Sequence, residues 1–185
     1  MLSPDQVRAA VDACYSAFLR DYSDAKLVEC FPALDACVVE HAGVPSHECE
    51  AIALTIAQHE VGRVPKWAAR AIRAIAERRP VVVVSNIWAP SHHWRGELTS
   101  SGIASSFSAT VFSTDLGAIK PSPRPFLSGL EAVAASPAEV LFVGDSLERD
   151  IYPAKLLGMA TCLVGTSAPE GSADFCVRSI VELTQ

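Results

Sequence analysis

The sequence has 185 residues, a formal net charge of −6 and a pI near 5.3, and half of its residues are hydrophobic. That length predicts one domain, or one domain with a small appendage. The hydrophobic fraction excludes a disordered chain, and the acidic balance offers no basic surface to nucleic acid or to an anionic membrane. We therefore expect a folded protein that binds neither nucleic acid nor a membrane.

The N-terminus and the cysteines indicate the compartment. Residues 1–6 read Met-Leu-Ser-Pro-Asp-Gln, without the basic start and apolar run of a secretion signal. No apolar stretch approaches the roughly 20 residues that cross a bilayer. The six cysteines are scattered without a Cys-x-x-Cys pair, which favours reduced thiols over disulfides or a zinc site. The sequence thus predicts a cytoplasmic protein.

The N-terminal third is predicted to be all-helical. Ser3 is followed by Pro4, and Gln6 lies three residues on, which is the pattern of a capped helix start. Apolar residues then recur at helical spacing, at Val7, Ala10, Val11, Cys14 and Phe18. Further helices fit the segment up to Gly62, and almost nothing before it is typical of a strand.

After Pro65 the pattern changes to helices that alternate with short apolar strands. The strands are predicted at residues 81–84, 110–113, 140–143 and 160–164. Apolar strands separated by helices are typical of a parallel sheet that is covered on both faces. We therefore predict an α/β fold, in which a helical unit of residues 1–64 precedes a Rossmann-like sheet of residues 65–185.

Polar residues lie beyond three of these strands, where open parallel sheets bind their ligands. Ser85 and Asn86 follow the first strand, Lys120 lies in the loop after the second, and Asp145 and Asp150 follow the third. Taken singly, each has a structural interpretation as a turn, a solvated loop lysine or a helix cap. Together, a hydroxyl, an ammonium and two carboxylates at one sheet edge predict a phosphate and Mg²⁺ site.

The segments around these residues resemble motifs of the haloacid dehalogenase superfamily, whose members are mostly phosphatases with some dehalogenases. The resemblance covers about residues 65–165. It is carried by residues 81–86 (Val-Val-Val-Val-Ser-Asn), 117–123 (Gly-Ala-Ile-Lys-Pro-Ser-Pro) with Phe126, and 141–150 (Leu-Phe-Val-Gly-Asp-Ser-Leu-Glu-Arg-Asp). It also implies that the helical unit is a cap of the kind that many members insert after their first strand.

The resemblance assigns a role to each polar residue. Ser85 and Lys120 would be catalytic. Ser85, the backbone N–H of Asn86 and Lys120 would bind the phosphoryl group, and Asp145 with Asp150 would ligate Mg²⁺. The implied partner is a small phosphorylated molecule, which the sequence does not name.

One family motif has no counterpart. The superfamily carries Asp-x-Asp-x-Thr at the end of an apolar strand, where the first Asp is the nucleophile and the second is the general acid and base. Asp21 and Asp24 are three apart, and Asp35 lacks a second Asp and a Thr, so we interpret all three as helix-surface or cap residues. Without the nucleophile we expect weak or absent Mg²⁺ binding and little or no phosphatase activity. The alternative is a non-catalytic member that is used for binding or assembly.

The family places the nucleophile strand between the strands at 81–84 and 140–143, which leaves two hypotheses. In the first, these two strands pair with each other directly. In the second, a partner chain or a further segment fills the position, because unpaired strand edges are costly when buried. The second hypothesis favours a homodimer, and so does the need to cover the apolar face of the helical unit.

The loop after Ser85 is rich in aromatic and imidazole groups. Trp88, His92, His93 and Trp94 either line a substrate pocket or pack a short helix onto the core. Packing is the favoured interpretation for Trp94, and His92 and His93 receive no role, since two histidines without a third ligand are weak signs of a metal.

Overall fold

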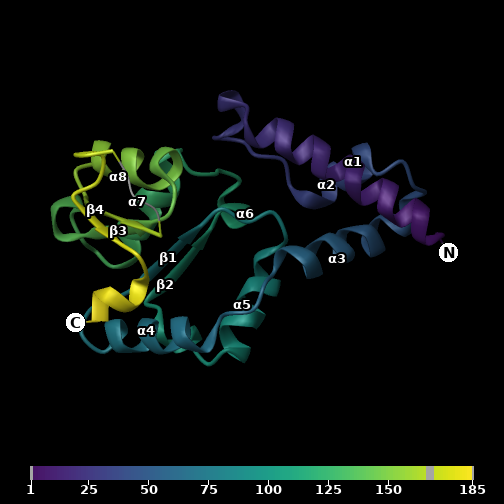
Figure 1. The fold of residues 1–185 in the computed structure, drawn as a ribbon. Helices are drawn as coiled ribbons and strands as arrows, with labels where there is room; N and C mark the ends of the chain where they lie inside the picture. Colours follow the sequence, from purple (N-terminus) through teal and green to yellow (C-terminus); the bar gives the residue numbers. More distant parts are fainter. Residues whose placement is uncertain (1, 166–168, 185) are drawn as a thin grey trace.

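The structure, a computed structural model, describes residues 2–165 and 169–184 (Figure 1). Its helices are α1 (Pro4–Tyr22), α2 (Leu34–His41), α3 (Cys49–Glu60), α4 (Lys66–Ala76), α5 (Ser91–Ser100), α6 (Ser113–Leu116), α7 (Pro123–Ala132) and α8 (Tyr152–Leu156). Its strands are β1 (Val82–Ser85), β2 (Ala109–Phe112), β3 (Leu141–Gly144), β4 (Ala160–Val164) and β5 (Phe175–Val177). Shorter helical segments are η1 (Ala25–Leu27), η2 (Ser46–Glu48), η3 (Ala104–Ser106), η4 (Pro137–Glu139), η5 (Leu147–Ile151, a π-helix) and η6 (Ile180–Thr184). None of the described helices is long and apolar enough to span a membrane.

The helical unit forms where the sequence predicts it. The Ser3 hydroxyl accepts from the Gln6 N–H, and the Gln6 side chain accepts from the Ser3 N–H, so the predicted cap is confirmed. Figure 1 shows α1 and α2 side by side and away from the strands, with α3 leading back towards α5. Trp88 and Ala89, which follow β1 in the chain, are buried in the same hydrophobic cluster as the helices. The core of the helical unit is therefore closed by residues from beyond the predicted boundary at residues 64–65.

The α/β fold is confirmed, and each of the four predicted strands lies within one residue of its predicted position. All pairings are parallel: β1 with β2, β3 with β4, and β4 with β5. The sequence analysis missed β5, a short strand. The Asp174 carboxylate, one residue before β5, accepts hydrogen bonds from the N–H and the hydroxyl of Thr161 in β4. The two residues are 13 apart in the chain, so no local sequence pattern predicts this contact.

The direct pairing of the strands at 81–84 and 140–143 is wrong. The described strands form two separate sheets, in the order β1-β2 and β3-β4-β5. The physical reason is that α7 packs on both. Gly129 of α7 faces β1, where an added Cβ would lie 3.1 Å from the Val84 side chain, and Phe126 stacks on Phe142 of β3 at 4.8 Å. One helix thus covers the neighbouring strands of both sheets without bringing their edges together.

Each of the two strands is left with an edge that pairs with no described strand, although Lys120 bonds the Val84 carbonyl on the edge of β1. In β3, the carbonyl of Val140 accepts from the N–H of Ala160, so the alternation of a parallel ladder directs the backbone groups of Leu141 and Val143 away from β4. Leu141 and Val143 are also 43% and 37% exposed, which is unusual for apolar residues in a strand of an α/β sheet. β3 therefore presents unpaired backbone groups and uncovered apolar side chains.

Candidate phosphate and metal site

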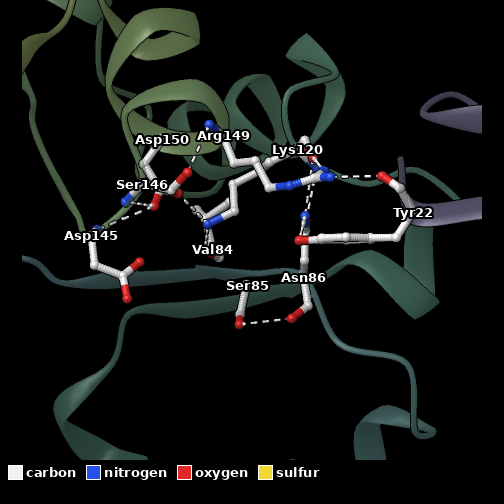
Figure 2. A network of polar contacts seen from close by, with 9 residues as sticks. All are labelled: Tyr22, Val84, Ser85, Asn86, Lys120, Asp145, Ser146, Arg149 and Asp150. Atoms are coloured by element: carbon white, nitrogen blue, oxygen red, sulfur yellow. Dashed lines mark hydrogen bonds and ion pairs between the residues drawn. The ribbon is translucent and has the colours of Figure 1, made fainter. Parts of the chain in front are cut away.

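Lys120 joins the carboxyl ends of the two sheets. Its ammonium group donates to the carbonyl oxygen of Val84, near the end of β1, at 3.0 Å, and to Asp150 Oδ1 at 2.6 Å (Figure 2). The side chains of Lys120 and Asp150 are only 12% and 5% exposed. A buried ion pair of this kind costs desolvation free energy and survives only because further hydrogen bonds hold its members.

Asp150 is held by the turn that follows β3. Its Oδ2 accepts from the N–H groups of Asp145 and Ser146 at 3.2 and 3.1 Å. Gly144 makes this possible, since an added Cβ there would lie 2.4 Å from the Asp150 Cβ. The Ser146 hydroxyl caps the π-helix η5 by accepting from the Arg149 N–H. The sequence Gly-Asp-Ser thus folds into a turn that aims a carboxylate at Lys120.

Asn86 holds the backbone of Lys120 with its side chain. Asn86 Oδ1 accepts from the Lys120 N–H at 2.7 Å, and Asn86 Nδ2 donates to the Lys120 carbonyl at 3.0 Å and to the Tyr22 hydroxyl at 3.1 Å. From the sequence, only the backbone N–H of Asn86 was expected to contribute to the site. The side chain adds a second link between β1 and the lysine loop.

Two contributors to the site were not predicted from the sequence. Arg149 donates to the carbonyls of Lys120 at 2.8 Å and Tyr22 at 2.6 Å, and its guanidinium lies 3.4 Å from the centre of the Tyr22 ring. Tyr22 ends α1 and lies 127 residues before Arg149 in the chain. The only signal available in the sequence was the place of Arg149 inside the segment between Asp145 and Asp150.

The remaining predicted residues lie at the same edge without joining the network. The Ser85 hydroxyl donates to the Asn86 carbonyl at 3.4 Å and points away from Lys120 in Figure 2. The Asp145 side chain is exposed, and its carboxylate has no partner among the described residues. The structure therefore brings Lys120, Asp150 and the backbone of Asp145 into one hydrogen-bonded network, with Asn86 bonded to it through the backbone of Lys120.

The donor set fits a water-rich Mg²⁺ site better than a closed one. Asp145 is free to bind a cation, whereas both oxygens of Asp150 already accept hydrogen bonds. Residues 2–165 and 169–184 contain no cluster of three or more His, Cys, Asp or Glu side chains. Mg²⁺ commonly keeps several waters and uses one or two carboxylates together with substrate phosphate. Asp145 and Asp150 fit this kind of coordination, but they do not fit a site in which the protein supplies all the ligands.

A small cavity of about 50 Å³ adjoins Asn86 on the side of the helical unit. Its lining is mostly aromatic and aliphatic: Phe18, Tyr22, Phe31, Glu60, Asn86, Ile87, Trp88 and Ile119. Glu60 accepts from the N–H groups of Trp88 at 2.6 Å and Ala89 at 2.5 Å. Of the aromatic and imidazole side chains singled out after Ser85, only Trp88 lines this cavity. The rings of His92 and His93 in α5 are tilted by 39°, with centroids 3.9 Å apart.

A family profile described as haloacid dehalogenase-like hydrolase matches residues 78–164. Phosphoserine phosphatase of Thermus thermophilus is 33% identical over 93 residues, which are 48% of this chain and 37% of that protein. The pyrimidine 5'-nucleotidase YjjG of Escherichia coli is 32% identical over 120 residues, 62% of this chain and 52% of that protein. The matches therefore span about a third to a half of these relatives.

Solved structures share the fold across nearly the whole chain. A 2-haloacid dehalogenase from Pseudomonas syringae superposes with a TM-score of 0.62 at 18% identity, covering 97% of this chain and 90% of that chain. A HAD phosphatase from Thermococcus onnurineus superposes with a TM-score of 0.55 at 19% identity, covering 94% and 89%. The likeness extends over the helical unit as well as the sheets.

Proposed function

This chain belongs to the haloacid dehalogenase superfamily, and we propose that it carries the phosphate- and Mg²⁺-binding part of a phosphatase-type hydrolase site. The observation that carries the proposal is Lys120, whose buried ammonium lies between the end of β1 and Asp150. The substrate class is a small phosphorylated molecule. Residues 1–64 act as a cap-like unit and residues 65–185 as the core, and a cytoplasmic location and a homodimer stay predictions from the sequence.

Each side chain has a task in this proposal. Lys120 neutralises a phosphoryl oxygen, and the backbone N–H of Asn86 donates to another. Ser85 donates its hydroxyl after rotating about its Cα–Cβ bond, since it now points towards the Asn86 carbonyl. Asp145, with the remaining lone pairs of Asp150 behind it, holds Mg²⁺, which would supply positive charge to the phosphoryl group.

The sequence contains no Asp-x-Asp-x-Thr motif, so the carboxylate that attacks phosphorus in the family has no counterpart in these 185 residues. Covalent phosphoryl transfer needs a positioned nucleophile, and neither Ser85 nor Lys120 can take that role without new geometry. We propose that an extended apolar segment pairs with the free edges of β1 and β3 and brings a carboxylate to Lys120. The exposed side chains of Leu141 and Val143 support this, because an inserted strand would need apolar neighbours.

The same free edges favour a second candidate function. A segment that pairs with β1 and β3 but carries no carboxylate would make this chain a binding or assembly module on a hydrolase fold. The free edges of β3 and β1 then serve as an interaction surface only.

Titration with inorganic phosphate and Mg²⁺, followed by calorimetry, tests the proposed site. We expect phosphate to bind in the presence of Mg²⁺, and Asp145→Asn to remove the dependence on Mg²⁺. Asp35→Asn, on the exposed first turn of α2, is the matched control and should bind as the unaltered chain does. Absence of phosphate binding at millimolar concentration would overturn the proposal.

Hydrolysis of p-nitrophenyl phosphate by the chain alone tests whether an added carboxylate is needed. The chain alone should show no turnover above the blank. Turnover by the chain alone that Asp145→Asn abolishes would contradict the need for an added carboxylate, although it would uphold the site.

A further inference from the structure

We infer that Tyr22 and Arg149 form a bridge that positions Lys120 only while the helical unit lies against the sheets. The inference rests on the proposed function in one respect, since it takes Lys120 as the anion-binding group. It assigns Tyr22 and Arg149 as positioning residues, which act through the lysine and not on the phosphoryl group. The consequence is that the position of the helical unit controls whether the site is assembled.

The first step is that Lys120 is held through its backbone. Its N–H and its carbonyl are both paired with the Asn86 side chain, at 2.7 and 3.0 Å, and the same carbonyl accepts from Arg149 at 2.8 Å. The direction of the ammonium group therefore depends on two side chains, one that follows β1 and one in η5 after β3. Losing either one removes part of the hydrogen bonding that holds the Lys120 backbone.

The second step is that Tyr22 binds both of these side chains at once. Its hydroxyl accepts from Asn86 Nδ2 at 3.1 Å, its carbonyl accepts from Arg149 at 2.6 Å, and its ring lies 3.4 Å beneath the guanidinium (Figure 2). Charge-assisted hydrogen bonds and a stacked guanidinium are among the stronger polar contacts in proteins. Tyr22 is the last residue of α1, so it moves with the helical unit.

The third step is that the segment after α1 also holds the lysine loop directly. The N–H of Phe31 donates to the Gly117 carbonyl, and the N–H of Ile119 donates to the Val28 carbonyl, both at 2.9 Å. The loop that carries Lys120 is thus bonded on one side by residues 28–31 and on the other by the bridge. Displacing the helical unit would remove both sets of contacts together.

The accessibility of Lys120 provides a test that needs no substrate. The four lysines are acetylated with an N-hydroxysuccinimide ester, and the rate at each is measured by peptide mass spectrometry. In the unaltered chain Lys120 should react slowly, and the exposed Lys66 serves as the internal reference. In Arg149→Met and in Tyr22→Leu, we expect the rate at Lys120 to rise about tenfold, while the rate at Lys66 stays constant.

Two further variants make the test specific. Arg149→Lys keeps the charge but cannot reach both carbonyls as a planar guanidinium does, so an intermediate rate is expected. Arg124→Met is the matched control, because Arg124 also links the two parts of the molecule, donating to the Glu29 and Leu116 carbonyls at 3.2 and 3.0 Å, without touching Lys120. Its rate at Lys120 should change less than about twofold.

The outcomes are distinct. An unchanged rate at Lys120 in Arg149→Met, or an equal rise in Arg124→Met, would overturn the inference. A rise confined to Arg149→Met and Tyr22→Leu, with unaltered circular dichroism, supports it. If inorganic phosphate and Mg²⁺ fail to protect Lys120 in the unaltered chain, the proposed function fails, whereas the bridge still stands on the rates of the variants.

Discussion

There is no room for a side chain at Gly144, where β3 leads into its turn. A Cβ there would lie 2.4 Å from the Asp150 Cβ and 2.6 Å from its Oδ2, closer than non-bonded atoms approach. Asp150 would have to shift, and its contacts with Lys120 and with the N–H groups of Asp145 and Ser146 would shift with it. The site is therefore sensitive to a single added methyl group.

We expect Gly144→Ala to lower the free energy of unfolding by about 1–3 kcal/mol, the usual cost of overpacking a tight site. Urea unfolding measures this, and acetylation of Lys120 should become faster as Asp150 moves. Gly96→Ala, in the interior of α5 with nothing within 4 Å of the added Cβ, is the control and should stabilise by about 0.5–1 kcal/mol. Equal effects from both substitutions would show that Asp150 does not depend on Gly144.

From the sequence, Lys120, Asp145 and Asp150 were predicted to lie at one edge, because the strand ends of a parallel sheet meet there. The structure brings Lys120 and Asp150 into contact, whereas the Asp145 side chain has no partner among the described residues, and the roles of all three stay predictions. Tyr22 and Glu60 were not predicted, since their partners lie far along the chain and each ends a helix in which its type is unremarkable. Contacts between distant segments carry no periodic signal that a single sequence can reveal.

At the level of elements, α7 is the helix that packs on both sheets. It packs Gly129 on β1 and Phe126 on Phe142 of β3, so it spans the neighbouring strands of both sheets. The four strands were predictable from their apolar runs, and so was the parallel arrangement. Their order across the two sheets was not, because the same apolar pattern fits direct pairing and separation equally well.

A carboxylate next to β5 bonds to β4. Asp174 accepts from the N–H and the hydroxyl of Thr161 at 2.8 and 2.7 Å, and hydrogen bonding by Thr161 lowers the pKa of Asp174 below its ordinary value of 3.8. A group whose pKa is lower in the folded state stabilises the fold above its ordinary pKa. That stability is lost as the pH falls through the lower, folded-state value.

Asp174→Asn should therefore lower the urea midpoint near neutral pH, and lower it less at a pH below 3.8, where this stabilisation is being lost in the unaltered chain. Urea unfolding at the two pH values, with Asp35→Asn as the control, measures the difference. A loss of stability that is the same at both pH values would mean that the charge of Asp174 contributes nothing to the pairing of β4 and β5.

For the molecule as a whole, the free edges of β1 and β3 matter most. A strand edge that neither pairs nor is covered tends to bind another strand. Here the two edges belong to sheets whose carboxyl ends meet at Lys120, and β3 adds the exposed Leu141 and Val143. An added segment or partner chain was one of two hypotheses from the sequence, and the separation of the sheets removes the other.

The remaining hypothesis predicts that a synthetic peptide will bind this chain and stabilise it. A suitable peptide has four alternating Val and Ile residues followed by Asp-Leu-Asp-Gly-Thr, so that its apolar part pairs with β1 and β3 and its first Asp reaches Lys120. At a hundredfold excess over its Kd, a ligand that binds only the folded state adds about 2.7 kcal/mol to the free energy of unfolding. Thermal unfolding with and without the peptide measures this shift.

A second peptide with Asn in place of the first Asp distinguishes strand pairing from catalysis by the added carboxylate. Both peptides should raise the melting temperature, because backbone pairing and apolar contacts are common to them, but only the Asp peptide should support hydrolysis of p-nitrophenyl phosphate with Mg²⁺. Stabilisation by both without turnover would favour the binding module. If neither peptide binds and light scattering shows a stable dimer, a second copy of this chain already covers the free edges, and the added segment is contradicted.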